Sequence, residues 1–95
     1  MPEVAFIERR IFALEGFRVK LCSQDGVDLR SDRRLPSGFP AYERRAADTS
    51  TVAQWKAARF RPAFVGLDVQ VLDAAGRPVH GRTLLGTVRR TYSVR

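Results

Sequence analysis

The stretch at residues 11–21 reads IFALEGFRVKL. In its second half, apolar residues alternate with Arg18 and Lys20, which is the period of two expected of a strand with one buried and one solvent-facing side. The pattern predicts a strand over residues 17–21 with one apolar face and one cationic face.

The first half of this stretch has two readings. Apolar residues recur at helical spacing through the N-terminal segment, and Gly16 suits the position just after a helix end. Alternatively, residues 11–14 pair with residues 17–21 in a hairpin that turns at Glu15 and Gly16, although glutamate is a poor first residue for a turn with positive φ. The sequence leaves both readings open. The residues of the helical stripe are Val4, Ile7, Ile11 and Leu14.

Three further segments have strand character. Residues 65–71 alternate between apolar and other residues and predict a second strand. Asp73–Gly76 has the composition of a turn, and residues 77–80 then predict a short returning strand that Pro78 restricts to an edge or a strand end. A last strand is predicted over residues 87–94, with alternate side chains on opposite faces.

One helix is predicted at about residues 50–61. Thr51 and Gln54 have the spacing of a capping box, and Pro62 prevents much continuation. On a helical wheel Trp55 falls outside the loose apolar arc, one turn before Arg59. The arc consists of Val52, Ala53, Ala57 and Phe60.

Together these elements predict an α+β fold in which a small, mainly antiparallel sheet of about four strands packs against one central helix. The open reading of the N-terminus would add a second helix. The length predicts a single compact domain over residues 1–95. Residues 31–47, SDRRLPSGFPAYERRAA, lack any regular period and predict a long basic loop.

Several classes of protein are disfavoured by composition. The single cysteine, Cys22, cannot form an internal disulfide, so a reducing, cytoplasmic setting is expected. The longest apolar run, residues 11–14, is far below the ~20 residues of a membrane helix, and we expect no membrane partner and no signal peptide. With one histidine, His80, no Cys/His metal cluster is expected, and no catalytic motif or cofactor site is recognised. We therefore expect a protein that is not an enzyme.

The strongest pointer to a partner is arginine. Fifteen arginines stand against two lysines, and the formal net charge is +7. The planar guanidinium grips phosphate or carboxylate with two parallel hydrogen bonds, which lysine cannot do. The competing explanation is codon bias, since arginine accompanies eleven alanines as in GC-rich genomes, together with solubility. Eight arginines form the doublets Arg9–Arg10, Arg33–Arg34, Arg44–Arg45 and Arg89–Arg90.

Two of these doublets carry the prediction of a binding surface. Both lie in the 31–47 loop, on either side of aromatic residues that could stack on unpaired bases. The predicted helix adds further cations that could follow phosphates. The predicted nucleic-acid-binding residues are Arg33, Arg34, Phe39, Tyr42, Arg44, Arg45, Lys56, Arg59 and Arg61.

The other two doublets are given less weight. Arg9–Arg10 is interpreted as balanced by the nearby acids Glu3, Glu8 and Glu15, and Arg89–Arg90 as divided between the two faces of a strand. The functional hypothesis is thus a small, non-catalytic, nucleic-acid-binding module. The alternative is a protein-interaction module, either a homodimer or an adaptor for an acidic partner protein.

Overall fold

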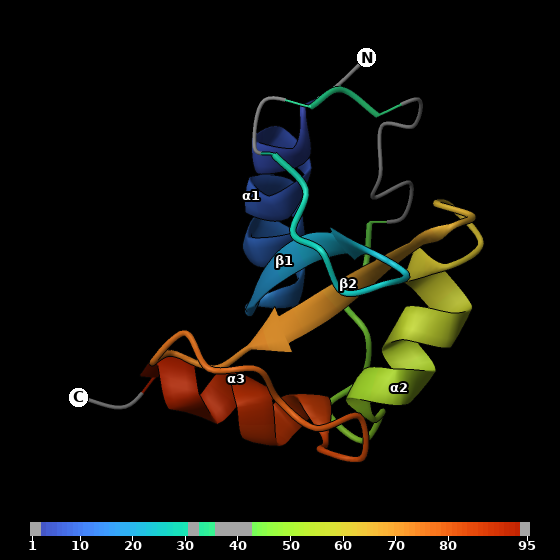
Figure 1. Ribbon diagram of the computed structural model, residues 1–95. Coiled ribbons are helices and arrows are strands. Elements are labelled where there is room, and N and C mark those ends of the chain that lie inside the picture. The colour runs from blue at the N-terminus through green and yellow to red at the C-terminus, as the bar shows by residue number, and fades with distance from the viewer. Residues whose placement is uncertain (1–2, 31–32, 36–42, 94–95) are drawn as a thin grey trace.

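Six elements follow one another along the chain, and Figure 1 shows the three α-helices arranged around a central pair of strands. The computed structural model describes residues 3–30, 33–35 and 43–93. Within these ranges the fold class is α+β, as predicted. The elements are α1 (Val4–Glu15), β1 (Arg18–Ser23), α2 (Val52–Trp55), the π-helical turn η1 (Lys56–Phe60), β2 (Leu67–Leu72) and α3 (Leu85–Ser93).

The N-terminal segment is a helix, which decides between the two readings left open by the sequence. Val4, Ile7 and Ile11 form its buried stripe. The helix ends at Gly16, whose φ of 84° is left-handed and whose amide donates to the carbonyl oxygen of Phe12. Glycine takes this conformation without the steric cost that a Cβ would add.

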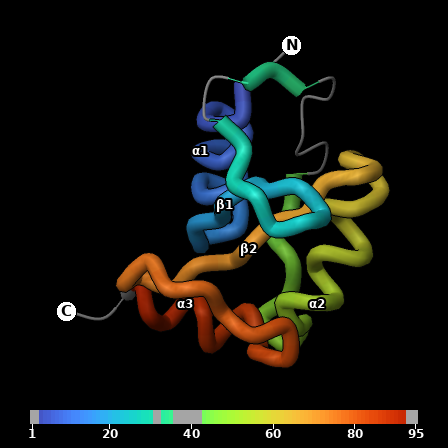
Figure 2. The backbone as a smooth tube through the Cα atoms, viewed as in Figure 1, coloured from blue at the N-terminus to red at the C-terminus, as the bar shows by residue number. Residues whose placement is uncertain are grey.

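The two strands pair antiparallel, with a register that runs from Arg18 opposite Leu72 to Ser23 opposite Leu67. Their apolar residues face the core, so the amphipathic reading of residues 17–21 is confirmed. On each outer edge a short segment continues the pairing for one bridge only. Figure 2 shows residues 27–30 beside β1, where Leu29 donates to the carbonyl oxygen of Leu21.

The prediction of about four strands exceeds what the described residues form, which is two. Residues 77–80 make a single bridge, Leu72 to Pro78, because proline has no amide hydrogen to extend a ladder. The prediction of a strand over residues 87–94 is wrong, because residues 87–93 lie in α3; residue 94 is outside the described residues. Leu85 and Val88 are buried at a spacing of three, and the helical stripe they begin was hidden by a chance alternation further along.

The capping box is confirmed at the start of α2. The Thr51 hydroxyl accepts from the Gln54 amide, and the Gln54 side chain accepts from the Thr51 amide. After Trp55 the helix widens into η1, where the Arg61 amide bonds to the carbonyl oxygen five residues earlier.

This π-helical turn explains why the helical wheel misplaced Trp55. Trp55 is 1% exposed and Phe60 is 0% exposed, so both face the core. In a regular α-helix, residues five apart point about 140° away from each other. The wider turn brings the two rings toward one side, with centroids 6.3 Å apart. Ala53 and Ala57, which the wheel placed on the buried arc, are exposed.

A buried carboxylate joins these elements. Glu15, at the end of α1, is 0% exposed and accepts four hydrogen bonds. The donors come from three other parts of the chain, and two of them are cations. They are the Ala46 amide at 2.9 Å, Trp55 Nε1 at 3.0 Å, Arg59 Nη1 at 3.0 Å and Arg89 Nη2 at 2.9 Å.

Arg89 extends this cluster. Its guanidinium also donates to the carbonyl oxygens of Glu15 and Ala46 and to the carboxylate of Asp48. Only 9% of the Arg89 side chain is exposed. One side chain of α3 is therefore bonded to the end of α1 and to the segment before α2.

We predict that Glu15→Gln lowers the free energy of unfolding by about 3 kcal/mol, because two buried or half-buried guanidiniums lose their counter-charge while the shape of the site is kept. Urea denaturation followed by the fluorescence of the single, buried Trp55 measures the change. Glu43→Gln, at an exposed glutamate, is the matched control. Equal midpoints for both variants would contradict a structural role for the Glu15 charge.

Candidate functional site

The predicted cations of the α2–η1 segment do not form one surface. Arg59 turns to Glu15 and to the carbonyl oxygen of Arg44, and 26% of its side chain is exposed. Lys56 is half-buried and acts electrostatically on Cys22 of β1, while Arg61 is exposed after the last turn. Arg59 thus belongs mainly to the structural cluster, and the helix offers no continuous basic face.

The aromatic residues considered for base stacking do not form one surface either. Phe39 and Tyr42 lie outside the described residues. Trp55 is buried against Phe17, with ring centroids 5.2 Å apart and planes at 85°, so it is not available to stack on a base. Phe6, which sequence reasoning did not single out, is 40% exposed on α1.

The Arg33–Arg34 doublet lies at the start of α1 and is split by the structure. The Val4 amide bonds to the carbonyl oxygen of Arg33, and Arg34 pairs in a bridge with Glu3. Both arginines are exposed. Arg33 lines two surface hollows, whereas Arg34 lies beside the first turn of the helix.

The Arg44–Arg45 doublet lies at the opposite end of the same helix. The Arg45 guanidinium is 2.9 Å from the point that a Cβ on Gly16 would occupy, just past the last residue of α1. The backbone at Arg44 is held by Arg59, and the Ala46 amide is held by the Glu15 carboxylate. Arg44 and Arg45 remain exposed.

Arg9–Arg10 lies on the solvent-facing side of α1, between these two doublets. Two of the three nearby acids have other partners, although Glu8 still lines one hollow with Arg9. Glu8 accepts from the Leu21 amide, and Glu15 is buried in its own cluster. The Arg10 guanidinium lies over the Phe6 ring, 5.7 Å from its centroid. Sequence proximity alone could not reveal that these acids were engaged.

We call five of these residues the cationic strip: two lie on α1, one lies at its first turn, and two lie just past its last turn. Its five members are exposed, and none of them forms an ion pair in the part of the chain that the structure describes. The exposed acids next to these arginines are Glu3 and Glu43, and Arg9 also lines a hollow with Glu8 and Arg18, whose opposite charges cancel, so the local net charge is +3. The members are Arg9, Arg10, Arg34, Arg44 and Arg45.

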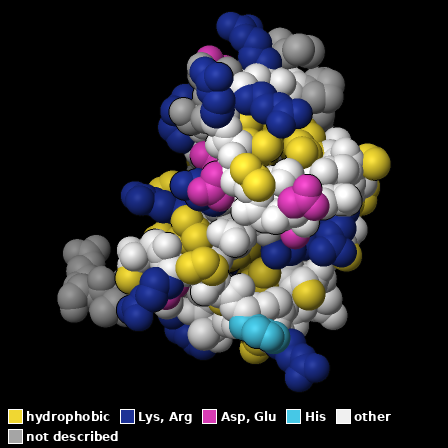
Figure 3. All heavy atoms as spheres, viewed as in Figure 1, with side chains coloured by type: hydrophobic (Ala, Val, Ile, Leu, Met, Phe, Trp, Pro, Cys, Tyr) yellow, Lys and Arg dark blue, Asp and Glu magenta, His cyan; other side chains and the backbone are white. Residues whose placement is uncertain are grey.

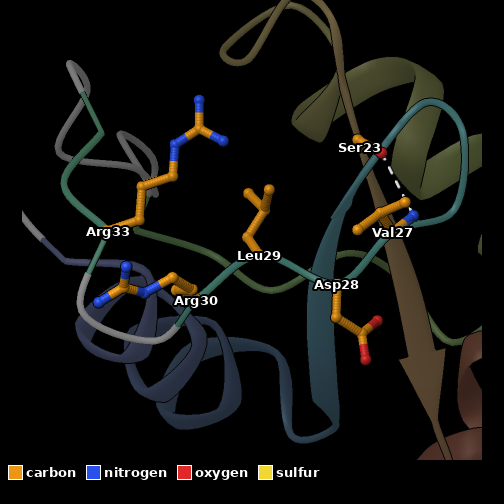
Figure 4. Close-up of a pocket in the computed structure, with 6 residues that line it drawn as sticks. All are labelled: Ser23, Val27, Asp28, Leu29, Arg30 and Arg33. Atoms are coloured by element: carbon orange, nitrogen blue, oxygen red, sulfur yellow. Dashed lines mark hydrogen bonds between the residues drawn. The ribbon is translucent and has the colours of Figure 1, made fainter.

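A second surface, the Arg33 groove, consists of two hollows that share Arg33. The first has a volume of about 610 Å³ and is shown in Figure 4, where Arg33 and Leu29 point the same way and Asp28 points away from them. The second hollow is close to the first, because Ser23 lines the first, Leu67 lines the second, and these two residues are partners in the β1–β2 register. The first is lined by Ser23, Val27, Asp28, Leu29, Arg30 and Arg33, and the second by Arg33, Leu35, Ala63, Phe64, Val65 and Leu67.

The other side of α1 is occupied by a structural aromatic contact. The rings of Phe12 and Tyr92 have centroids 5.7 Å apart, and the Arg18 guanidinium lies 5.5 Å from the Phe12 centroid. The Tyr92 hydroxyl donates to the carbonyl oxygen of Leu72 and accepts from the Arg18 amide. Burial raises the pKa of Tyr92, which keeps this hydroxyl a donor at neutral pH.

Two residue types that often carry chemistry have ordinary roles here. His80 Nδ1 accepts from the Arg82 amide in a turn. Cys22 is buried, and burial raises the pKa of its thiol, so it stays protonated and weakly nucleophilic at neutral pH. Among the described residues no group of three or more His, Cys, Asp or Glu could hold a metal ion. None of the helices in those ranges is long and apolar enough to cross a membrane.

Comparison with protein-family models, curated proteins and solved structures finds no match for this chain. The chemistry of its own surface is therefore the basis for a functional proposal.

We predict that Glu8→Gln stabilises the protein at pH 7. Burial raises the pKa of Glu8 above its ordinary 4.5, an effect opposed by the hydrogen bond from the Leu21 amide and by Lys20. The folded state therefore binds this proton more tightly than the unfolded state, and stability falls as pH rises through the folded pKa. Glutamine imitates the protonated acid and can still accept from Leu21.

The gain in the free energy of unfolding should be full at pH values above the raised pKa of Glu8 in the folded state. It should vanish at pH values below the pKa that Glu8 has in the unfolded state. Urea midpoints of both proteins across this pH range measure the difference, in which other carboxylates cancel. A gain that persisted under acidic conditions would contradict the titration of Glu8 as its cause.

Proposed function

We propose that this protein is a non-catalytic nucleic-acid-binding module that holds a phosphate backbone along the cationic strip. The observation that carries this proposal is the placement of arginines from three doublets along one helix, with a local net charge of +3. A one-signed surface of this kind attracts polyanions, and guanidiniums match the geometry of phosphate oxygens.

The length of the strip supports this assignment. The 12 residues of α1 span about 18 Å. One strand of B-DNA presents a phosphate about every 3.4 Å of axis, so a backbone lying beside the helix would offer about five phosphates. The strip has five arginines. Arg34 marks its first end and Arg45 its last.

The contacts are expected to be mostly insensitive to sequence. Arginines that hold phosphates position a nucleic acid without reading its bases. Phe6 is the exposed ring on the outer side of α1, and a ring in this setting can stack on any unpaired base. We therefore favour single-stranded over duplex nucleic acid for the tightest complex.

The salt dependence of binding tests the strip. With five phosphates neutralised on duplex DNA, log K against log salt should have a slope of about −4.5, from roughly −0.9 per contact. Arg34→Ala with Arg45→Ala removes one contact at each end and should bring the slope to about −2.7. Fluorescence anisotropy of a labelled oligonucleotide at several salt concentrations gives both values.

Arg77→Ala with Arg82→Ala is the matched control, because it removes the same charge from exposed positions outside the strip. The proposal fails if the wild type binds neither duplex nor single strand at low salt. It also fails if the control pair lowers the slope as much as the strip pair.

A second variant tests stacking. Phe6→Leu should weaken binding to a single strand by about 1–3 kcal/mol, the usual value of one stacked base, and leave duplex binding almost unchanged. Phe12→Leu is the control, since Phe12 is equally exposed at 40% but its ring already contacts Tyr92 and the Arg18 guanidinium. Equal losses for both variants would assign the effect to helix packing instead of stacking.

A further inference from the structure

The Arg33 groove contains exposed apolar residues that the cationic strip does not explain. Val27 is 65% exposed and Val65 is 91% exposed, and each lines one of the two hollows. Leu29 and Leu67, which are only partly buried, line the first and the second hollow, on the two sides of β1. Apolar surface of this kind gains free energy when a partner removes it from water.

The charges around this apolar surface are divided by sign. Arg30 and Arg33 lie at one end of the first hollow, and Asp28 lies at the other (Figure 4). In Figure 3 the upper group of hydrophobic side chains has basic side chains above it and acidic side chains below it, and further basic side chains lie beside and below the acidic ones. Asp28 is paired with Lys20 at 3.2 Å.

Asp25 supplies an unengaged acid near the same end. It lies at the tip of the turn whose two feet, Ser23 and Val27, line the first hollow. Hydrogen bonds between Ser23 and Val27 close the turn. Asp25 is exposed and has no ion pair among the described residues. Within the described ranges the groove therefore has an unpaired cation, Arg33, in its lining, and an unpaired acid, Asp25, on the turn that borders it beyond Ser23 and Val27.

This arrangement is self-complementary. In a two-fold dimer each copy presents the same patch, turned so that one end of it meets the opposite end in its partner. Arg33 of one copy would meet Asp25 of the other, twice in each dimer, with the exposed valines in the centre. We propose that the Arg33 groove docks a second copy of this chain in this way.

A uniformly acidic partner fits the groove less well. Its carboxylates would be attracted by Arg33 but would be repelled by Asp25 and by Asp28 at the other end. A second copy places both signs opposite their complements. The proposal goes beyond nucleic-acid binding and does not depend on it, because none of the five strip residues lines the groove.

Sedimentation equilibrium of the full chain, from about 1 µM to about 500 µM, tests the dimer. The wild type should shift from monomer to dimer in this range. Arg33→Glu alone and Asp25→Arg alone each place like charges together and should weaken the dimer at least about tenfold. The double variant restores opposite charges and should return the dissociation constant to within about threefold of wild type.

Arg34→Glu, next to Arg33 in sequence but outside the groove, is the control and should leave the dimer unchanged. Circular dichroism of each variant shows whether it folds, and Val65→Ser provides a charge-neutral variant that should also weaken the dimer. A wild type that stays monomeric throughout, or a double variant as weak as the single ones, overturns the proposal. Anisotropy with an oligonucleotide reports strip binding separately, so the two proposals can fail independently.

Discussion

The hydrogen bonding of the Glu15 carboxylate is the interaction on which the rest of the structure depends. A buried carboxylate loses the hydration it would have in water, and it is tolerated only when donors and counter-charges replace that hydration. Here the replacement comes from Ala46, Trp55, Arg59 and Arg89, so the end of α1, the segment before α2, the α2–η1 helix and α3 must all meet at one point. The small two-stranded sheet alone would not hold these helices in place.

The same cluster sorts the arginines into two kinds. Arg59 and Arg89 are held by Glu15 and serve the fold. Because Glu15 is used in this way, it cannot balance the cations on the outer side of α1, and the strip stays positive. Arg33 and Arg34, adjacent in the chain, serve different surfaces, since one lines the groove and the other lies beside α1. An arginine excess that looks uniform in the sequence is therefore divided among three places in the fold: the Glu15 cluster, the cationic strip and the Arg33 groove.

The sequence predicted local structure correctly where residues close together in the chain determine it. The alternation at residues 17–21 and the capping box at Thr51 both appear as expected, because each needs only contacts within a few residues. The strand predicted over residues 87–94 is instead helical over residues 87–93, because a period of two and a helical stripe coincide there and only packing against the core separates them. Trp55 was misplaced because a regular wheel cannot anticipate a π-helical turn.

The sequence by itself determined the α+β class, the positions of β1 and the capped helix, and an arginine-rich, positively charged surface. It could not determine which arginines are free, because that depends on long-range ion pairs. Glu15 pairs with Arg59, which is 44 positions away in the chain, and with Arg89, which is 74 positions away. Only the tertiary structure buries Glu15, divides the doublets and brings Arg9, Arg10, Arg34, Arg44 and Arg45 to one helix. The physical reason is that the partners of a buried charge must be close to it in space, and the local periodicity of the sequence carries no information about residues that are distant in the chain.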